Sequence, residues 1–230
     1  MNDPSELRVA LATGAATSAL VYPAGRNPIG ATLVLGHGAG AGQHSAFMVE
    51  FARALAALGL DLVTFNFLYT AQRRRIPDRA PVLESCYRAV VDGVRRAVPS
   101  AARHLFIGGK SMGGRIATQI AAADPELAID GLVLLGYPLH PPGRPDQPRD
   151  KHLPAIRRPM LIVQGSRDAF GLPAELQPIL DRLTPRPILE VVADGDHSFK
   201  LPRRNPAAQG AVFSNVQRTI ANWIASTIER

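Results

Sequence analysis

The chain has 230 residues, of which 46% are hydrophobic, so it is long enough to bury a core as one domain, residues 1–230. Its single cysteine could not form a disulfide bond within the chain, and a core of this size does not need one. Lys and Arg number 26 against 19 Asp and Glu, but the arginines stand in short clusters without interleaved aromatic residues, so the composition does not favour nucleic-acid binding. The amino-terminal residues lack the basic region and long apolar run of a signal peptide, and no stretch approaches the ~18 apolar residues of a membrane span, so we expect a cytoplasmic protein without a membrane partner.

Apolar runs bounded by glycine and proline alternate along the chain with helical patterns, which predicts an α/β fold with a mostly parallel sheet and helices on both faces. Several runs, such as Ala-Thr-Leu-Val-Leu, are almost continuously aliphatic, as expected of strands that are covered on both sides. Eight strands are predicted: Leu7–Ala12, Ser18–Tyr22, Ala31–Leu35, Asp61–Phe65, Leu105–Gly108, Gly131–Leu135, Met160–Gln164 and Ile188–Val192.

Apolar residues at helical spacing predict five helices between and after these strands. The helices are expected at Ala46–Leu58, Val82–Val98, Met112–Ala123, Glu175–Leu183 and Asn215–Ile228, with Cys86 on a core-facing side. The segment His140–His152 has four prolines and no apolar periodicity, which predicts a loop. Because this loop is short and polar, we do not expect it to form a large apolar lid.

A Gly-x-Ser-x-Gly motif centred on Ser111 lies between a predicted strand and a predicted helix. That context is the one in which the motif forms a nucleophile elbow, with the serine exposed at the tip of a strained turn. Lys110 and Ser111 also match the end of a phosphate-binding loop, but the first glycine of such a loop would fall on His104, within strand-like sequence. We therefore interpret Ser111 as a nucleophile and exclude nucleotide binding.

A serine nucleophile needs a general base and an acid that orients it, and both follow downstream. Asp168 comes shortly after the predicted strand Met160–Gln164, and His197 shortly after Ile188–Val192. The chain order Ser, Asp, His, each beyond the carboxyl end of a strand, predicts a triad of Ser111, Asp168 and His197. Asp194 and Asp196 are alternatives for the acid, but they share the short loop that carries His197.

The tetrahedral intermediate of such a reaction requires two N–H donors for its oxyanion. Met112, directly after the nucleophile, would supply the first. The turn Gly36–Gly42, with four glycines and few side chains, would supply the second from Ala39. His37 in the same turn is interpreted as a structural brace.

The stretches GHGAGA, Asn66–Asp78 (NF-x-Y followed by RRR-x-PD), GGKSMGGR, QGSRDAFG and DGDHSF together resemble one family. The chain resembles the α/β-hydrolase superfamily, and within it the dienelactone-hydrolase-like branch that includes testis-expressed protein 30 and KANSL3-type proteins. The resemblance implies a compact hydrolase fold with a small or absent lid, and it does not supply a substrate.

The predicted function is therefore that of a serine hydrolase, in particular a carboxylesterase acting on a small-molecule acyl substrate, without a cofactor or a metal. The histidines show no metal-ligand spacing. A non-catalytic binding or scaffold protein with the same fold is the alternative, since the fold alone does not decide function. Arg73-Arg74-Arg75 could recognise anionic substrates or be solvated surface, and the sequence leaves open whether the chain forms a homodimer.

Overall fold

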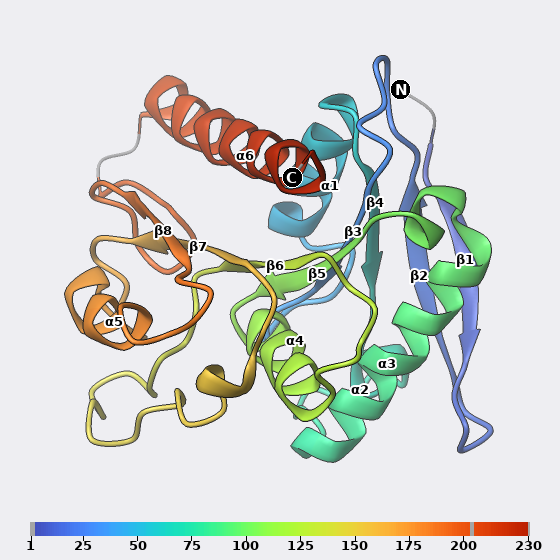
Figure 1. Ribbon diagram of the computed structural model, residues 1–230, viewed down its shortest axis with the longest axis horizontal. Helices are drawn as coiled ribbons and strands as arrows, with labels where there is room; N and C mark the ends of the chain where they lie inside the picture. Colours follow the sequence, from blue (N-terminus) through green and yellow to red (C-terminus); the bar gives the residue numbers. More distant parts are fainter. Residues whose placement is uncertain (1–2, 203–204, 230) are drawn as a thin grey trace.

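The fold is built on a single twisted sheet of eight strands (Figure 1). A computed structural model describes residues 3–202 and 205–229. The strands are β1 (Ser5–Ala10), β2 (Ala16–Tyr22), β3 (Thr32–Gly36), β4 (Asp61–Phe65), β5 (Leu105–Lys110), β6 (Gly131–Leu135), β7 (Met160–Gly165) and β8 (Ile188–Val192), arranged in the order β1-β2-β4-β3-β5-β6-β7-β8. Strands β1 and β2 pair antiparallel with each other and β2 with β4, and the other pairs are parallel. The predicted α/β class and all eight strands are confirmed.

The helices cover both faces of this sheet. They are α1 (Ala46–Ala57), α2 (Leu68–Ala71), α3 (Ala80–Ala97), α4 (Met112–Ala123), α5 (Pro173–Leu180) and α6 (Pro206–Ile228), with short 3₁₀ turns at Pro99–Ala102 and Leu153–Ala155. Figure 1 shows α1 and α6 together on one side of the sheet and α3 and α4 on the other. None of the helices in the described part of the chain is long and apolar enough to cross a membrane.

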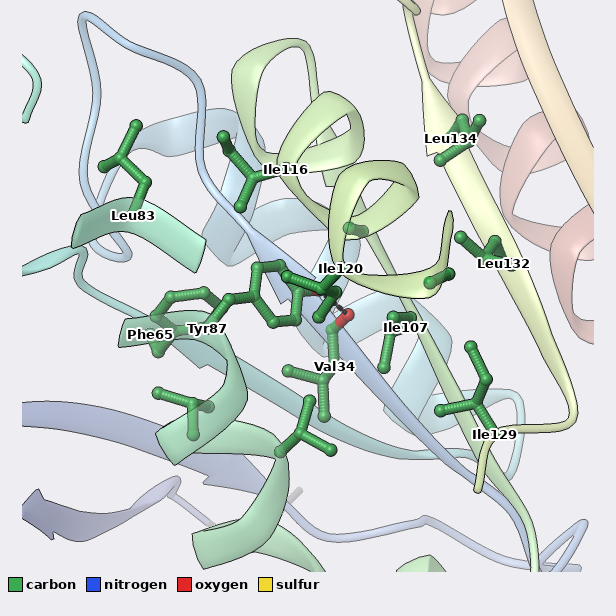
Figure 2. Close-up of a cluster of buried hydrophobic side chains, with 14 of the residues drawn as sticks. Val34, Phe65, Leu83, Tyr87, Ile107, Ile116, Ile120, Ile129, Leu132 and Leu134 are labelled. Carbon is green, nitrogen blue, oxygen red and sulfur yellow. Dashed lines mark hydrogen bonds between the residues drawn. The ribbon is translucent and has the colours of Figure 1, made fainter. Parts of the chain in front are cut away.

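Two apolar cores result, one on each face of the sheet. The first contains Phe51 of α1 and Phe213 of α6, packed on β3 and β6. The second lies beneath α3 and α4 and includes Tyr87, Ile116 and Ile120 (Figure 2). Because β3, β5, β6 and β7 are buried along their whole length between these cores, their sequences are the almost continuous apolar runs noted above.

Tyr87 of α3 brings a hydroxyl into the second core and uses it on the sheet. Its Oη donates to the carbonyl oxygen of Gly108 at 2.6 Å and accepts a hydrogen bond from the Gly108 N–H at 3.0 Å. A Cβ at Gly108 would lie 1.8 Å from the carbonyl oxygen of Val133, so no larger residue fits at this point of β5. Helix α3 is thereby attached to the strand that leads to Ser111.

The helix predictions differ from the structure at three places, one of which is α5, which ends at Leu180 and not at Leu183. The final helix begins at Pro206 and not at Asn215, and α2 was not predicted. The segment 140–152 is a loop, as expected, and Cys86 is buried, with burial raising the pKa of its thiol to about 11.

Candidate active site

Ser111 occupies the turn between β5 and α4. Its backbone has φ 52° and ψ −115°, a conformation that side-chain-bearing residues rarely adopt, and its N–H donates to the carbonyl oxygen of Leu135 at 3.0 Å. The flanking glycines are required by close approach: a Cβ at Gly109 or Gly113 would lie 2.3 or 2.1 Å from the carbonyl oxygen of Gly36. The Gly-x-Ser-x-Gly motif therefore forms the strained strand-to-helix turn that its sequence predicts.

His197 and Asp168 lie on neighbouring loops and meet directly. His197 Nδ1 is 2.7 Å from Asp168 Oδ2, and the Asp168 side chain is fully buried. Because a carboxylate only accepts, Nδ1 carries the proton, which leaves His197 Nε2 as an acceptor. The ring of Phe170 lies against the imidazole, with centroids 4.2 Å apart and planes at 31°.

The two alternative acids, Asp194 and Asp196, differ from Asp168 in their surroundings. Asp196 Oδ1 accepts from the N–H groups of Ser198 and Lys200 at 2.7 and 2.9 Å, so this carboxylate ties the loop together. Asp194 is exposed, and its own N–H donates to Ser166 Oγ. Of the three aspartates, Asp168 is the one hydrogen-bonded to His197 among the described residues.

Ser111 and His197 open onto the same cavity, which has a volume of about 350 Å³. Its wall also includes Ala39, Phe47, Met48 and Phe170. Within residues 3–202 and 205–229, no hydrogen bond links Ser111 Oγ to His197. Nucleophile-to-base hydrogen bonds are often long without substrate and shorten when it binds.

The glycine-rich turn Gly36–Gly42 forms a second wall of the cavity and is held by the segment that follows β4. His37 is buried, its Nε2 accepts from the N–H of Phe67 at 3.1 Å, and its Nδ1 therefore donates to the carbonyl oxygen of Gly38 at 2.8 Å. Burial lowers the pKa of His37, so the neutral ring is favoured in this bracing position. Tyr69 Oη donates to the carbonyl oxygen of Ala39 at 2.8 Å.

Of the two predicted oxyanion donors, Ala39 lines the same cavity as Ser111, and Met112 directly follows Ser111 in the chain. Among the described residues, the N–H groups of Ala39 and Met112 donate to no acceptor. Met112 is the first residue of α4, where N–H groups lack partners within the helix and carry partial positive charge. Both groups are therefore free to bind an anionic oxygen.

Sequence reasoning gave no role in the site to Lys110, whose side chain lines the same cavity. Its Nζ is buried without a hydrogen-bond partner and lies 5.8 Å from the centre of the Phe47 ring. Burial lowers the pKa of Lys110 to about 8, although Asp168 and Asp196 act in the opposite direction. The sequence signal that could have drawn attention to Lys110 is its position as a charged residue at the end of the otherwise apolar strand β5.

Gln164, Phe170 and Tyr69 stand in the motifs quoted above, but sequence reasoning gave them no role in the site, because their contacts join distant segments. The three arginines at 73–75 do not line the cavity with Ser111, and Arg74 pairs with Asp78 at 2.7 Å. In the described ranges, no group of three or more His, Cys, Asp or Glu side chains could hold a metal ion.

Comparison with solved structures gives chains of the same fold over almost the whole length. A serine hydrolase without a lid from Xanthomonas campestris is 24% identical, with 95% of this chain and 96% of that chain covered and a TM-score of 0.70. A dienelactone hydrolase from Anabaena variabilis is 20% identical, with 94% and 97% covered and a TM-score of 0.70. A serine hydrolase homologue from Coxiella burnetii is 16% identical, with 96% and 98% covered and a TM-score of 0.75.

These identities establish a shared fold and no more. The model of the family described as alpha/beta hydrolase domain matches residues 30–225, which include the turn of Ser111, both loops of the Asp168–His197 pair and the glycine-rich turn. The chain belongs to the alpha/beta hydrolase domain family.

Proposed function

We propose that this protein is a serine hydrolase that cleaves an ester or other acyl bond through an acyl-enzyme intermediate, and that its substrates are small carboxylic esters. The observation that carries the proposal is the hydrogen-bonded His197–Asp168 pair in the same cavity as the strained Ser111. Serine hydrolases and esterases among the proteins of the same fold agree with it.

In the proposed mechanism, Ser111 Oγ attacks the acyl carbon while His197 Nε2 takes its proton. The negative oxygen of the tetrahedral intermediate accepts hydrogen bonds from the N–H groups of Ala39 and Met112. His197 then gives the proton to the leaving alcohol, and Asp168 stabilises the transient imidazolium. Water, activated by the same histidine, attacks the acyl-enzyme and releases the acid.

The cavity supports a small acyl substrate. Its volume of about 350 Å³ is at the lower end of the range for small-molecule sites, and Phe47, Met48 and Phe170 give it apolar walls. The loop 140–152 contributes no residue to these walls, in agreement with the absence of a lid. We place the chain in the branch that includes testis-expressed protein 30 and KANSL3-type proteins, on the motifs described above.

The test combines fluorophosphonate labelling with hydrolysis of p-nitrophenyl esters of increasing acyl length. The parent should be labelled at Ser111 and prefer short chains, whereas Ser111→Ala should lose labelling and at least about 10³-fold in kcat while unfolding like the parent. Ser100→Ala, on the 3₁₀ turn after α3, is a control that removes a serine hydroxyl outside the cavity. Labelling that persists in Ser111→Ala would refute the assignment, and a parent that neither labels nor hydrolyses any ester would favour the scaffold alternative.

A further inference from the structure

Gln164, near the end of β7, is a fully buried amide that contacts the Asp168 carboxylate. Its Nε2 donates to Asp168 Oδ2 at 2.9 Å, and the same oxygen is bonded to His197 Nδ1 at 2.7 Å. The other oxygen, Oδ1, accepts from the N–H of Phe170 at 2.8 Å. Among the described residues, this buried carboxylate has three donors, of which Gln164 is the one side chain other than His197.

The remaining contacts of Gln164 determine which way its amide faces. Its Oε1 accepts from the N–H of Tyr137 at 2.8 Å, and its Nε2 also donates to the carbonyl oxygen of Gly171 at 2.7 Å. A flipped amide would direct its NH₂ at the Tyr137 N–H and its oxygen at a carbonyl and a carboxylate. The surrounding backbone therefore requires the amide nitrogen to face Asp168.

We propose that Gln164 is a positioning residue, which acts through Asp168 to hold the imidazole of His197 in the orientation needed for proton transfer. This inference rests on the proposed function. A buried carboxylate that lacks a donor is free to rotate toward other partners, and His197 would then lose the fixed acceptor that orients its ring. A residue that only joined β6 to β7 would instead affect stability and leave turnover unchanged.

Two replacements separate these roles. Gln164→Glu retains the acceptor for the Tyr137 N–H but directs a carboxylate at Asp168, which repels it when both are ionised. Gln164→Leu removes the amide without adding charge and serves if the glutamate variant does not fold. Gln217→Leu, at a buried glutamine of α6 that does not line the cavity, is the matched control.

The experiment measures kcat and KM for a short p-nitrophenyl ester, fluorophosphonate labelling rates and thermal unfolding. We expect the Gln164 variants to lose about tenfold or more in kcat and labelling rate with KM within about twofold, and Gln217→Leu to retain the parent values. In an Asp168→Asn background, the same Gln164 replacements should cost less than about twofold, because the residue through which they act is already disabled. Parent-like kcat in the Gln164 variants, or an equal loss in both backgrounds, would overturn the inference.

A second measurement does not depend on catalysis. The proton on His197 Nδ1 should give a downfield NMR resonance, identified by its loss in His197→Ala, and this resonance should shift or broaden in the Gln164 variants. If the parent hydrolyses nothing, the proposed function fails, but this resonance still tests whether Gln164 positions the Asp168–His197 pair. A resonance unchanged in folded Gln164 variants would refute the positioning role.

Discussion

Replacing Lys110 by methionine should stabilise the protein at neutral pH. The Lys110 ammonium is buried without a hydrogen-bond partner, and burial lowers its pKa from the ordinary 10.5 to about 8. Each pH unit between these values corresponds to about 1.4 kcal/mol, so the protonated side chain costs the folded state about 3 kcal/mol. Methionine has a similar length and no charge, and it should remove most of this cost.

The effect should depend on pH in a defined direction. Between pH 8 and 10.5 the unfolded chain still binds the Lys110 proton whereas the folded chain has released it, so the free energy of unfolding of the parent rises with pH in this window. Below pH 8 the full cost is present. The advantage of Lys110→Met should therefore be about 3 kcal/mol at pH 7 and should disappear toward pH 10.5.

Urea unfolding of both proteins at intervals from pH 7 to 10.5 measures this difference, in which other titrating groups cancel. Lys151→Met, at an exposed lysine, is the control and should show no comparable change. The reasoning is refuted if Lys110→Met is less stable than the parent at pH 7, or if the difference is the same at both ends of the range. Measuring kcat/KM of the same variant will show whether hydrolysis requires the buried charge.

Asp168→Asn should lower kcat for ester hydrolysis by about 10³-fold or more, because it disturbs the tautomer of His197. Asp194→Asn, at an exposed carboxylate, should change kcat less than about threefold. The reverse ranking would assign the acid to the loop that carries His197. Tyr69→Phe removes the hydrogen bond that holds the Ala39 carbonyl. This variant should reduce kcat about fivefold, the equivalent of one hydrogen bond of ~1 kcal/mol, and leave KM unchanged. Full activity would show that the turn is held without the Tyr69 hydroxyl. Changing Arg73, Arg74 and Arg75 together to glutamine should alter kcat/KM equally for neutral and anionic esters of similar size, because none of the three arginines lines the cavity. A selective loss of kcat/KM on the anionic ester would assign these arginines to substrate recognition.

The strands could be predicted from sequence because a strand that is buried on both faces has a mostly apolar local sequence. Thr32–Gly36 and Met160–Gly165 are mostly apolar runs that end in glycine, and their predicted bounds differ from the observed ones by one residue at each end or less. The exposed edge strand Ser5–Ala10 was predicted two residues too late because one face of it contacts solvent and its pattern is weak. The start of α6 was missed because Ala207, Ala208 and Gly210 dilute the apolar periodicity, although Asn205 caps the helix by accepting from the Ala208 N–H.

In the candidate site, too, the residues that stand in local motifs could be predicted, and the contacts between distant segments could not. Ser111, Asp168 and His197 stand in short local motifs after strands, so their positions were predictable, and the structure brings Asp168 and His197 into contact. Whether Asp168 or Asp194 meets the ring depends on how two loops fold over the sheet, which no local pattern records. Gln164 reads from sequence as the end of an apolar strand, and its role depends on three segments that converge on one amide.

The contact between Gly36 and Gly113 also bears on how the site responds to motion. A Cβ at Gly113 would lie 2.1 Å from the carbonyl oxygen of Gly36, so the backbones of the end of β3 and the first turn of α4 approach each other closely at this point. Ala39 follows the first of these segments and Met112 lies in the second, so this backbone contact links the two N–H donors, and the hydrogen bonds of His37 and Tyr69 hold the turn that carries Ala39. Rotamer exchange in core side chains other than His37 and Tyr69 should therefore change this spacing little, whereas the acyl pocket is bounded by the side chains of Phe47 and Phe170 and depends directly on their rotamers.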